Sequence, residues 1–413
     1  MITDSDIRKV YDYIQTHWDD TIRYTPEDTD LVLGMPYPYT VPCAKDERMQ
    51  NYFYWDMYFT NVGLLRHGFQ KTAKNNTDDL LYFLDKYGYV PNGNRTIFLN
   101  RSQPPLLSMM VKEIFQNEGD KEWLARAYQT LETEYEFWMN KRAAVKGLNR
   151  HGHHASDDEL LNFYEVELAY RIPFEPENDR DKVNIADHFL SEGETGWDFS
   201  PRFDGRGADF MQVELNCFLH MHEVNNAHFC EVLDNGMSGD WIERANNRKV
   251  RFHDHFWSRE RGLFLDYDFV NQRHSRIASL GTFAPLWAHI ANDEQAASVV
   301  DKLSLFEHDY GISVCEKSEQ KITFQWDYPN GWPPIFYVTI NGLLNYGYHD
   351  DAQRIAKKYI DVVVKNFNET GELWEKYNVV NGSIKVKDEY KMPAMMGWTA
   401  GVFVYCVDLL EGK

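Results

Sequence analysis

Apolar residues recur at the three- and four-residue spacing of amphipathic helices through most of the chain. The pattern begins in "SDIRKVYDYIQTHW", continues in "KEWLARAYQTLETEYEFWMN" and "WIERANNRKVRFHDHFW", and ends in "GWTAGVFVYCVDLL". It also covers residues 282–303 and 333–367, whereas strand-like alternation is scarce and short. Because no linker divides the chain, the sequence predicts an all-α fold of about a dozen helices in a single domain over residues 1–413.

Single residues mark some of the expected helix ends. Glycines are expected to end helices at Gly68 and Gly88, and Thr77 is a candidate cap for the helix that ends on Gly88.

Long polar and aromatic loops are expected between the helices, at residues 36–54, 89–101, 146–205, 308–332 and 371–397. Their many Trp, Tyr, Arg, Asn and Asp residues argue against disorder. Rings that stack on a sugar face, together with planar hydrogen-bonding side chains, are suited to carbohydrate binding. The segment "QWDYPNGWPP" (residues 325–334) fits this interpretation best. The alternative is a rigid turn whose tryptophans fold into the core.

Composition narrows the range of partners. The 413 residues carry 43 Lys and Arg against 64 Asp and Glu, a formal net charge of −21, which argues against nucleic acid or an anionic membrane. The five scattered cysteines, without a CxxC pair, are expected to be buried reduced thiols. No apolar run approaches the ~18 residues of a membrane helix, and no signal peptide is visible, so we expect a cytoplasmic protein.

Five segments together suggest a family. They are "RMQNYFYWDMYF" (48–59), "VPNGNRTIFLNRSQPP" (90–105), "ETGWDFSPRF" (194–203), "QWDYPNGWPP" and "WEKYN" (374–378), followed by "EY" at 389–390 and "GWTAG" at 397–401. In this order the chain resembles the trehalases, glycoside hydrolase family 37, from about residue 35 to 410. The resemblance implies an (α/α)6 barrel with the site formed by loops at one end, and inverting hydrolysis of an α-glucosidic bond. It implies that Asp198 is the general acid and that Glu375 is the general base.

The same two carboxyl groups can be interpreted from their neighbours. Inverting hydrolysis needs two carboxyls about 6.5–9.5 Å apart, with room for one water. Trp197 and Phe199 flank Asp198 and could desolvate it, which raises the pKa of an acid. Lys376, if turned toward Glu375, would keep the base ionised. Outside the motifs, Asp198 could equally be a helix cap and Glu375 half of a surface ion pair.

The resemblance also implies substrate-binding residues, which would hydrogen-bond sugar hydroxyls or stack on the ring. They are Arg48, Trp55, Asp56, Asn92, Arg101, Gln103, Glu177, Gln325, Trp326, Asp327 and Glu389. A site that pairs every hydroxyl discriminates strongly between substrates.

Three departures from the family pattern concern the second sugar. Glu175 stands where the family has an arginine, and Arg171 or Arg180 could substitute for that cation. Gln50 and Asn51 replace an arginine and a glutamate, and the glycine-rich lid before Glu389 is missing. We therefore expect a small carbohydrate substrate, trehalose or a closely related α-glucoside.

Other interpretations remain open. The same machinery could act on another glucosyl or mannosyl conjugate, as in the related family 63. A sugar epimerase would need a paired-histidine motif, which is not visible, and a catalytically inactive sugar-binding module would not need both carboxyls. The segment "HGHHASDDE" (151–159) is expected to be a solvated loop rather than a metal site. No metal or other cofactor is implied, because protons and water suffice.

Overall fold

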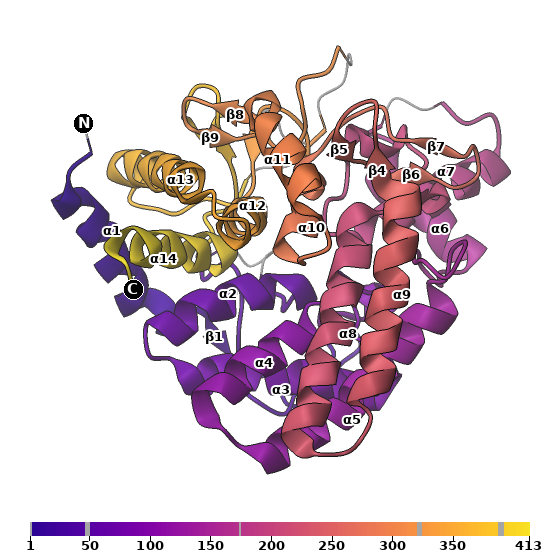
Figure 1. Ribbon diagram of the computed structural model, residues 1–413, viewed down its shortest axis with the longest axis horizontal. Coiled ribbons are helices and arrows are strands. Elements are labelled where there is room, and N and C mark those ends of the chain that lie inside the picture. Colours follow the sequence, from indigo (N-terminus) through magenta and orange to yellow (C-terminus); the bar gives the residue numbers. More distant parts are fainter. Residues whose placement is uncertain (1, 46–49, 173–174, 320–323, 387–391) are drawn as a thin grey trace.

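Helices make up most of the chain that the computed structural model describes, namely residues 2–45, 50–172, 175–319, 324–386 and 392–413 (Figure 1). The prediction of a mainly helical fold is confirmed, with fourteen α-helices in these residues. They are α1 (Asp4–His17), α2 (Tyr54–Arg66), α3 (Gln70–Tyr87), α4 (Leu107–Glu118), α5 (Lys121–Lys141), α6 (Asp157–Phe163), α7 (Asp179–Gly193), α8 (Val213–Leu233), α9 (Ser238–Phe256), α10 (Ala284–Trp287), α11 (Asp293–Asp301), α12 (Pro333–Asn345), α13 (His349–Thr370) and α14 (Gly397–Glu411).

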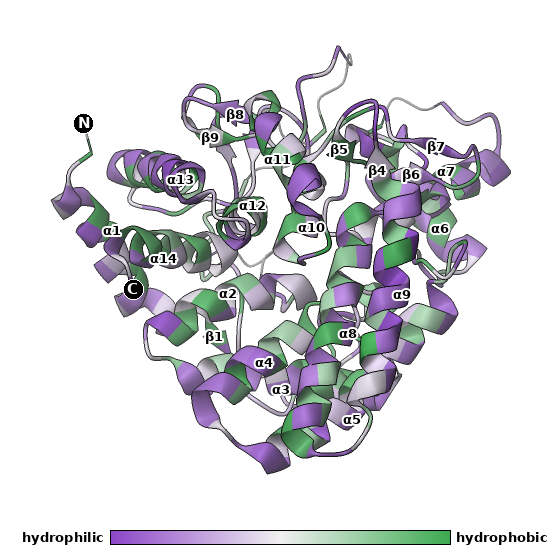
Figure 2. Ribbon diagram, in the orientation of Figure 1, coloured by the Kyte–Doolittle hydropathy of each residue, from purple (hydrophilic) through white to green (hydrophobic). Residues whose placement is uncertain are grey.

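Six of these helices contact one another in a closed cycle. Helix α2 packs on α4, α4 on α8, α8 on α10, α10 on α12, α12 on α14, and α14 returns to α2. Other helices lie against members of this cycle: α3 on α2 and α4, α5 on α4 and α8, α9 on α8, and α13 on α12 and α14. Helices α2, α12 and α14 are buried along nearly their whole length, whereas α9 and α13 carry a polar outer face (Figure 2). All-round burial is what an inner helix requires.

Two glycines allow α14 to close the cycle against α2. A Cβ atom at Gly401 would lie 1.9 Å from the Phe59 carbonyl oxygen, and one at Gly63 would lie 2.7 Å from the Gly401 Cα. The two backbones therefore approach more closely at this point than any side chain permits.

The strands in the described residues are two residues long and pair antiparallel, in four two-stranded sheets and one three-stranded sheet of β3, β6 and β7, and they connect loops. Strands β4 to β9 lie along the top of the molecule in Figure 1. The strands are β1 (Ile22–Arg23), β2 (Tyr39–Thr40), β3 (Phe210–Met211), β4 (Trp257–Ser258), β5 (Leu263–Phe264), β6 (Tyr267–Asp268), β7 (Arg273–His274), β8 (Glu307–His308), β9 (Gly311–Ile312), β10 (Asn330–Gly331) and β11 (Tyr377–Asn378).

The predicted loop 146–205 is wrong, because it contains α6, a π-helical turn (Tyr164–Leu168) and α7. Helix α6 begins with a capping box in which Ser156 and Glu159 satisfy each other's backbone N–H groups. Helix α7 begins at the cap Asn178, whose side chain accepts from the Asp181 N–H. The apolar sides of these helices form a small core of their own around Leu168, separate from the main one.

Other helix boundaries also differ from the predictions. Gly88 does end a helix, in the left-handed conformation, but that helix begins at Gln70, and Thr77 lies inside it with its hydroxyl donating to the Ala73 carbonyl. Residues 282–303 divide into α10 and α11, because Asn292 caps a new start. Residues 333–367 fall in two helices, α12 and α13, with Gly347 at positive φ between them.

The five cysteines are buried thiols, as predicted. In the described part of the chain no helix combines the length and apolar content that crossing a membrane needs.

Candidate active site

Two cavities meet at Asp198. The smaller has a volume of about 220 Å³ and the larger about 620 Å³, and both are lined by Phe53, Gln103, Arg171 and Asp198. The described residues that line only the smaller cavity are Trp55, Asp56, Gly196, Gln325, Trp326, Trp332, Glu375, Met395 and Trp398. The smaller cavity thus brings together most of the residues that the sequence singled out, including both candidate catalytic carboxyls.

Glu375 is held at the smaller cavity by contacts on both sides. Its carboxylate lies 2.8 Å from the ammonium of Lys376, which is fully buried, so Lys376 does turn toward it. On the other side, the indole N–H of Trp398, in the first turn of α14, donates to the Glu375 carbonyl at 3.1 Å. Lys376 thus pairs with the carboxylate, and Trp398 anchors the backbone that carries it.

The segment 325–334 joins the two halves of the site. The Trp326 N–H donates to the Phe199 carbonyl, and the Gln325 side-chain amide donates to the Asp198 carboxylate at 3.0 Å. At its other end the segment forms β10, which pairs with β11 directly after Glu375 and Lys376. The non-helical part of this segment, residues 325–332, therefore connects the two candidate catalytic carboxyls, and its last two residues begin α12.

The tryptophans of this segment are buried and also line the smaller cavity. Trp326 stacks on Trp332 at 3.9 Å and on Trp197 at 5.6 Å, with nearly parallel rings. The guanidinium of Arg202 covers Trp197, and the Lys376 ammonium covers Trp332. The sequence raised two alternatives for these tryptophans, aromatic surface at a cavity or rings folded into the core. Both therefore apply.

Burial dominates the electrostatics of the smaller cavity. It raises the pKa of Asp198, the guanidiniums of Arg171 and Arg101 oppose this rise, and the Glu375 charge adds to it. Burial also holds the pKa of Asp56 well above its ordinary value, with help from the charges of Glu375 and Asp198. A carboxyl with a raised pKa is what a general acid requires.

The segment 90–105 supplies the polar wall between the cavities. Gln103 accepts from the Trp55 N–H at 3.1 Å, and Asn92 donates to the Ser102 carbonyl. Arg101 lines the larger cavity with Asn92. Burial lowers the pKa of the Arg101 guanidinium to about 10, and its Nε lacks a hydrogen-bond partner among the described residues.

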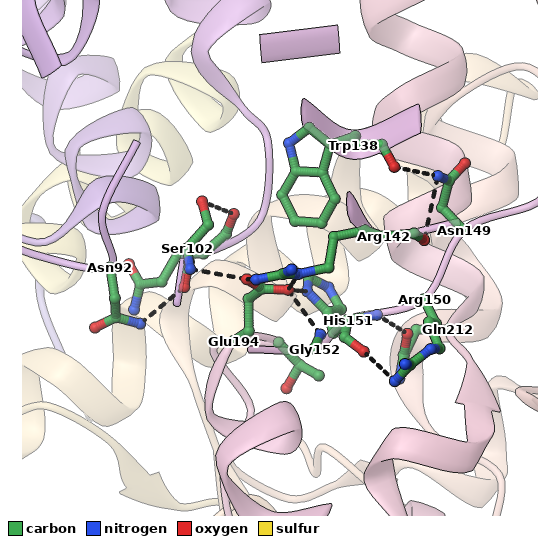
Figure 3. A network of polar contacts seen from close by, with 12 residues as sticks. Asn92, Ser102, Trp138, Arg142, Asn149, Arg150, His151, Gly152, Glu194 and Gln212 are labelled. Carbon is green, nitrogen blue, oxygen red and sulfur yellow. Dashed lines mark hydrogen bonds and ion pairs between the residues drawn. The ribbon is translucent and has the colours of Figure 1, made fainter. Parts of the chain in front are cut away.

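Behind this wall lies a buried ion pair that ties three segments together (Figure 3). Both oxygens of Glu194 accept from Arg142 at 2.7 Å, and both side chains are almost completely buried. The same carboxylate accepts from the backbone N–H groups of Ser102 and Gly152 at 2.8 Å. Glu194 thereby fixes the segment that carries Arg101 and Gln103 to the one that carries Asp198.

The predicted solvated loop 151–159 is wrong at both ends, since His151 and Gly152 are buried and residues 157–159 lie in α6. His151 Nδ1 lies 3.4 Å from Glu194, and its backbone N–H donates to Gln212 (Figure 3). The buried carboxylate of Glu194 contacts both residues and so holds the beginning of this segment in the interior.

Several predicted residues lie away from the cavities. Glu177 is exposed, just before the cap of α7, and lines neither cavity. Asp327 is buried and accepts from the Tyr328 N–H, and burial raises its pKa to about 6, but it lines neither cavity either. Their roles stay predictions. Arg48 and Glu389 lie outside the described residues.

The exposed Glu175 lines neither cavity, and only one of its two candidate substitutes lies at the site. Arg171 lines both cavities and stacks on Phe199 at 3.6 Å, whereas Arg180 is exposed and pairs with Asp157.

Some cavity residues were not predicted. Phe53 lines both cavities, and Met395 and Trp398 line the smaller one. Gly196 also lines it, at a φ of +73°, where a Cβ would lie 2.6 Å from the Trp55 ring. Trp398 and Gly196 stand inside the quoted motifs "GWTAG" and "ETGWDFSPRF", which was the available signal. Phe53 likewise stands inside the quoted motif "RMQNYFYWDMYF", whereas nothing in the sequence distinguishes Met395.

Known proteins resemble this chain over most of its length. A family model described as Trehalase matches residues 1–411. A trehalase of Tenebrio molitor is 31% identical over 394 residues, which cover 86% of this chain and 69% of that protein. A periplasmic trehalase of Xanthomonas oryzae pv. oryzae is 30% identical over 428 residues, covering 97% and 73%.

Solved structures agree with these matches. Neutral trehalase Nth1 from Saccharomyces cerevisiae aligns with a TM-score of 0.77 at 25% identity, covering 99% of this chain and 80% of that one. A mannosylglycerate hydrolase of glycoside hydrolase family 63 from Thermus thermophilus, in complex with glucose, aligns with a TM-score of 0.68 at 14% identity, covering 96% and 100%, which is a likeness of fold. The chain therefore belongs to the trehalase family, glycoside hydrolase family 37.

Proposed function

We propose that this member of the trehalase family hydrolyses trehalose with inversion, with Asp198 as general acid and Glu375 as general base. One observation carries the proposal: Asp198 lines both cavities, whereas Glu375 lines only the smaller one. An acid that protonates the glycosidic oxygen belongs between the two sugars, and a base that activates water belongs on the far side of the cleaved sugar. The cleaved glucose then occupies the smaller cavity and the leaving group the larger.

The remaining residues of the smaller cavity then hold the cleaved glucose. Asp56 and Gln325 would hydrogen-bond its hydroxyls, and Trp55 and Trp398 would contact its ring faces. Gln325 also positions the acid, since it donates to the Asp198 carboxylate. Protons and water complete the reaction.

The architecture that we propose for this reaction is an (α/α)6 barrel in a single domain. The closed cycle of α2, α4, α8, α10, α12 and α14, with other helices packed outside it, supports an inner and an outer ring. A cytoplasmic location stays a prediction.

A second candidate is the same reaction on another α-glycoside, of the kind found in family 63. The unequal cavities favour it, because trehalose has two identical halves while one cavity has nearly three times the volume of the other.

Proton NMR of the purified protein with trehalose tests the first candidate. An inverting enzyme releases one β-glucose from the cleaved half and one α-glucose as leaving group, so the two anomers should appear in equal amounts before mutarotation. Release of α-glucose alone would contradict inversion. Absence of glucose would exclude trehalose and favour the second candidate.

The pH dependence of kcat/KM tests the assignment of the acid. Because the Arg171 cation favours the ionised form of Asp198, Arg171→Gln should raise the pKa of Asp198. The acid then stays protonated to higher pH, and the alkaline limb of the profile should move upward. Arg180→Gln removes the same charge from an exposed position and is the matched control. An unmoved limb in the Arg171 variant would argue that another group acts as the acid.

A further inference from the structure

The larger cavity has a greater volume than a second glucose requires, and its lining is more apolar than a sugar needs. Its volume of about 620 Å³ compares with about 220 Å³ for the cavity assigned to one glucose. Of the described residues, those that line only the larger cavity are Asn92, Ile97, Phe98, Asn100, Arg101, Glu159, Asn162, Phe163, Val166, Glu167, Phe189, Leu190, Gly193 and Phe199. Seven of them are apolar side chains, whereas a glucose leaving group offers mainly hydroxyls.

These apolar side chains converge from different elements. Ile97 and Phe98 come from a short 3-10 helix (Thr96–Phe98), and Phe163 and Val166 come from the end of α6 and the π-helical turn. Phe189 and Leu190 come from α7. Ile97 is 59% exposed and Val166 is 56% exposed, although both line the cavity. Large aliphatic side chains left open to solvent at a cavity are typical of a surface that a ligand covers.

Several polar groups of the same wall are already bound to one another. Asn100 accepts from Arg101 at 2.9 Å and donates to Glu159 at 3.3 Å, and Arg171 lies 3.6 Å from Glu167. At the junction with the smaller cavity, Gln103, Arg171 and Asp198 can contact a leaving-group oxygen. The larger cavity is thus polar where the bond breaks and has apolar surface beyond it.

We propose that this cavity binds leaving groups with an alkyl or aryl portion, so that the substrates include amphipathic α-glucosides. The inference rests on the proposed function, because it uses the same cleavage step. The bond between the anomeric carbon and the glycosidic oxygen breaks, and Asp198 gives its proton to that oxygen. Water supplies the new hydroxyl at the anomeric carbon, and Glu375 takes its other proton. An alcohol is released in place of a second glucose.

A homologous series of α-D-glucopyranosides from methyl to hexyl tests this directly. Primary alcohols are nearly equal as leaving groups, so chain length reports binding in the cavity rather than reactivity. If each methylene is buried, kcat/KM should rise by about two- to fourfold per added methylene. A series in which kcat/KM does not change with chain length would overturn the proposal.

Two variants test whether the alkyl chain binds in the larger cavity. Val166→Asn and Ile97→Asn should each flatten the chain-length dependence, measured within each variant as the ratio of kcat/KM for hexyl glucoside to kcat/KM for methyl glucoside. Val270→Asn is the matched control, since Val270 is also 56% exposed but lines neither cavity. An unchanged slope in both cavity variants would place the alkyl chain elsewhere and contradict the proposal.

Trehalose, measured alongside, separates this inference from the proposed function. Activity on trehalose with a flat alkyl series overturns the inference alone. A rising series without activity on trehalose supports the inference and overturns trehalose as substrate. Activity on neither overturns both.

Discussion

Replacing Asp198 by Asn is expected to lower kcat on trehalose by about 10²- to 10⁴-fold without unfolding the protein. The asparagine keeps the shape of the side chain but cannot give a proton to the glycosidic oxygen. Glu375→Gln should cause a loss of similar size, because water is no longer activated. Steady-state kinetics measure both effects, and thermal unfolding checks the fold.

The leaving group distinguishes the two roles. α-Glucosyl fluoride needs little protonation to depart, so Asp198→Asn should lose much less activity on it, while Glu375→Gln should lose as much as on trehalose. Asp79→Asn is a matched control, because Asp79 is a buried carboxyl whose pKa burial raises to about 8, and it lines neither cavity. Near-normal activity of either site variant, or equal losses of Asp198→Asn on both substrates, would contradict the assignment.

The Glu194→Gln variant is expected to lose about 3–5 kcal/mol of unfolding free energy, because it leaves the Arg142 guanidinium buried without a counter-charge. It should also lower kcat/KM, since Glu194 holds the backbone of Ser102, next to Arg101 and Gln103. Adding Arg142→Met removes the stranded charge. The double variant should recover most of the stability but not the activity, and recovery of both would assign the pair a purely structural role.

The pH dependence gives a second readout of the same pair. Burial alone would raise the pKa of Glu194, but Arg142 and His151 hold it well below its ordinary value of 4.5. A depressed pKa stabilises the folded state above the ordinary value, and this stabilisation is lost as the pH falls below it. The difference in unfolding free energy between the wild type and Glu194→Gln should therefore be full at neutral pH and shrink below about pH 4.5.

The sequence predicted the parts of this site that lie within short motifs. Trp55 and Asp56, Gln325 and Trp326, and the two candidate carboxyls all line one cavity. The contacts between motifs could not be predicted from the sequence, because they join residues far apart in the chain. Nothing near Arg142 indicates that it binds Glu194, and Arg171 was only one of two candidates until the fold placed Arg180 on the surface.

Helix type was easier to predict than helix ends. The long apolar periodicities of α5, α9 and α14 correspond to real helices. Helices α6 and α7 were missed because their apolar stripes pack on a small separate core, and α6 has only 7 residues. The start of α3 was misplaced because a threonine can cap a helix or bond back to its own preceding turn, and at Thr77 the second contact forms.

The close contact of Gly63 and Gly401 also constrains how the chain folds. Helix α2 can pack against α14 only after every residue between them has been synthesised. The contact that closes the cycle is therefore made late, between residues far apart in the sequence. Helix α14 also holds the backbone next to the site: Thr399 donates to the Trp374 carbonyl, and Trp398 donates to the Glu375 carbonyl. Closure of the helix cycle therefore also anchors the backbone of the candidate base, and a nascent chain that still lacks α14 lacks both of these contacts.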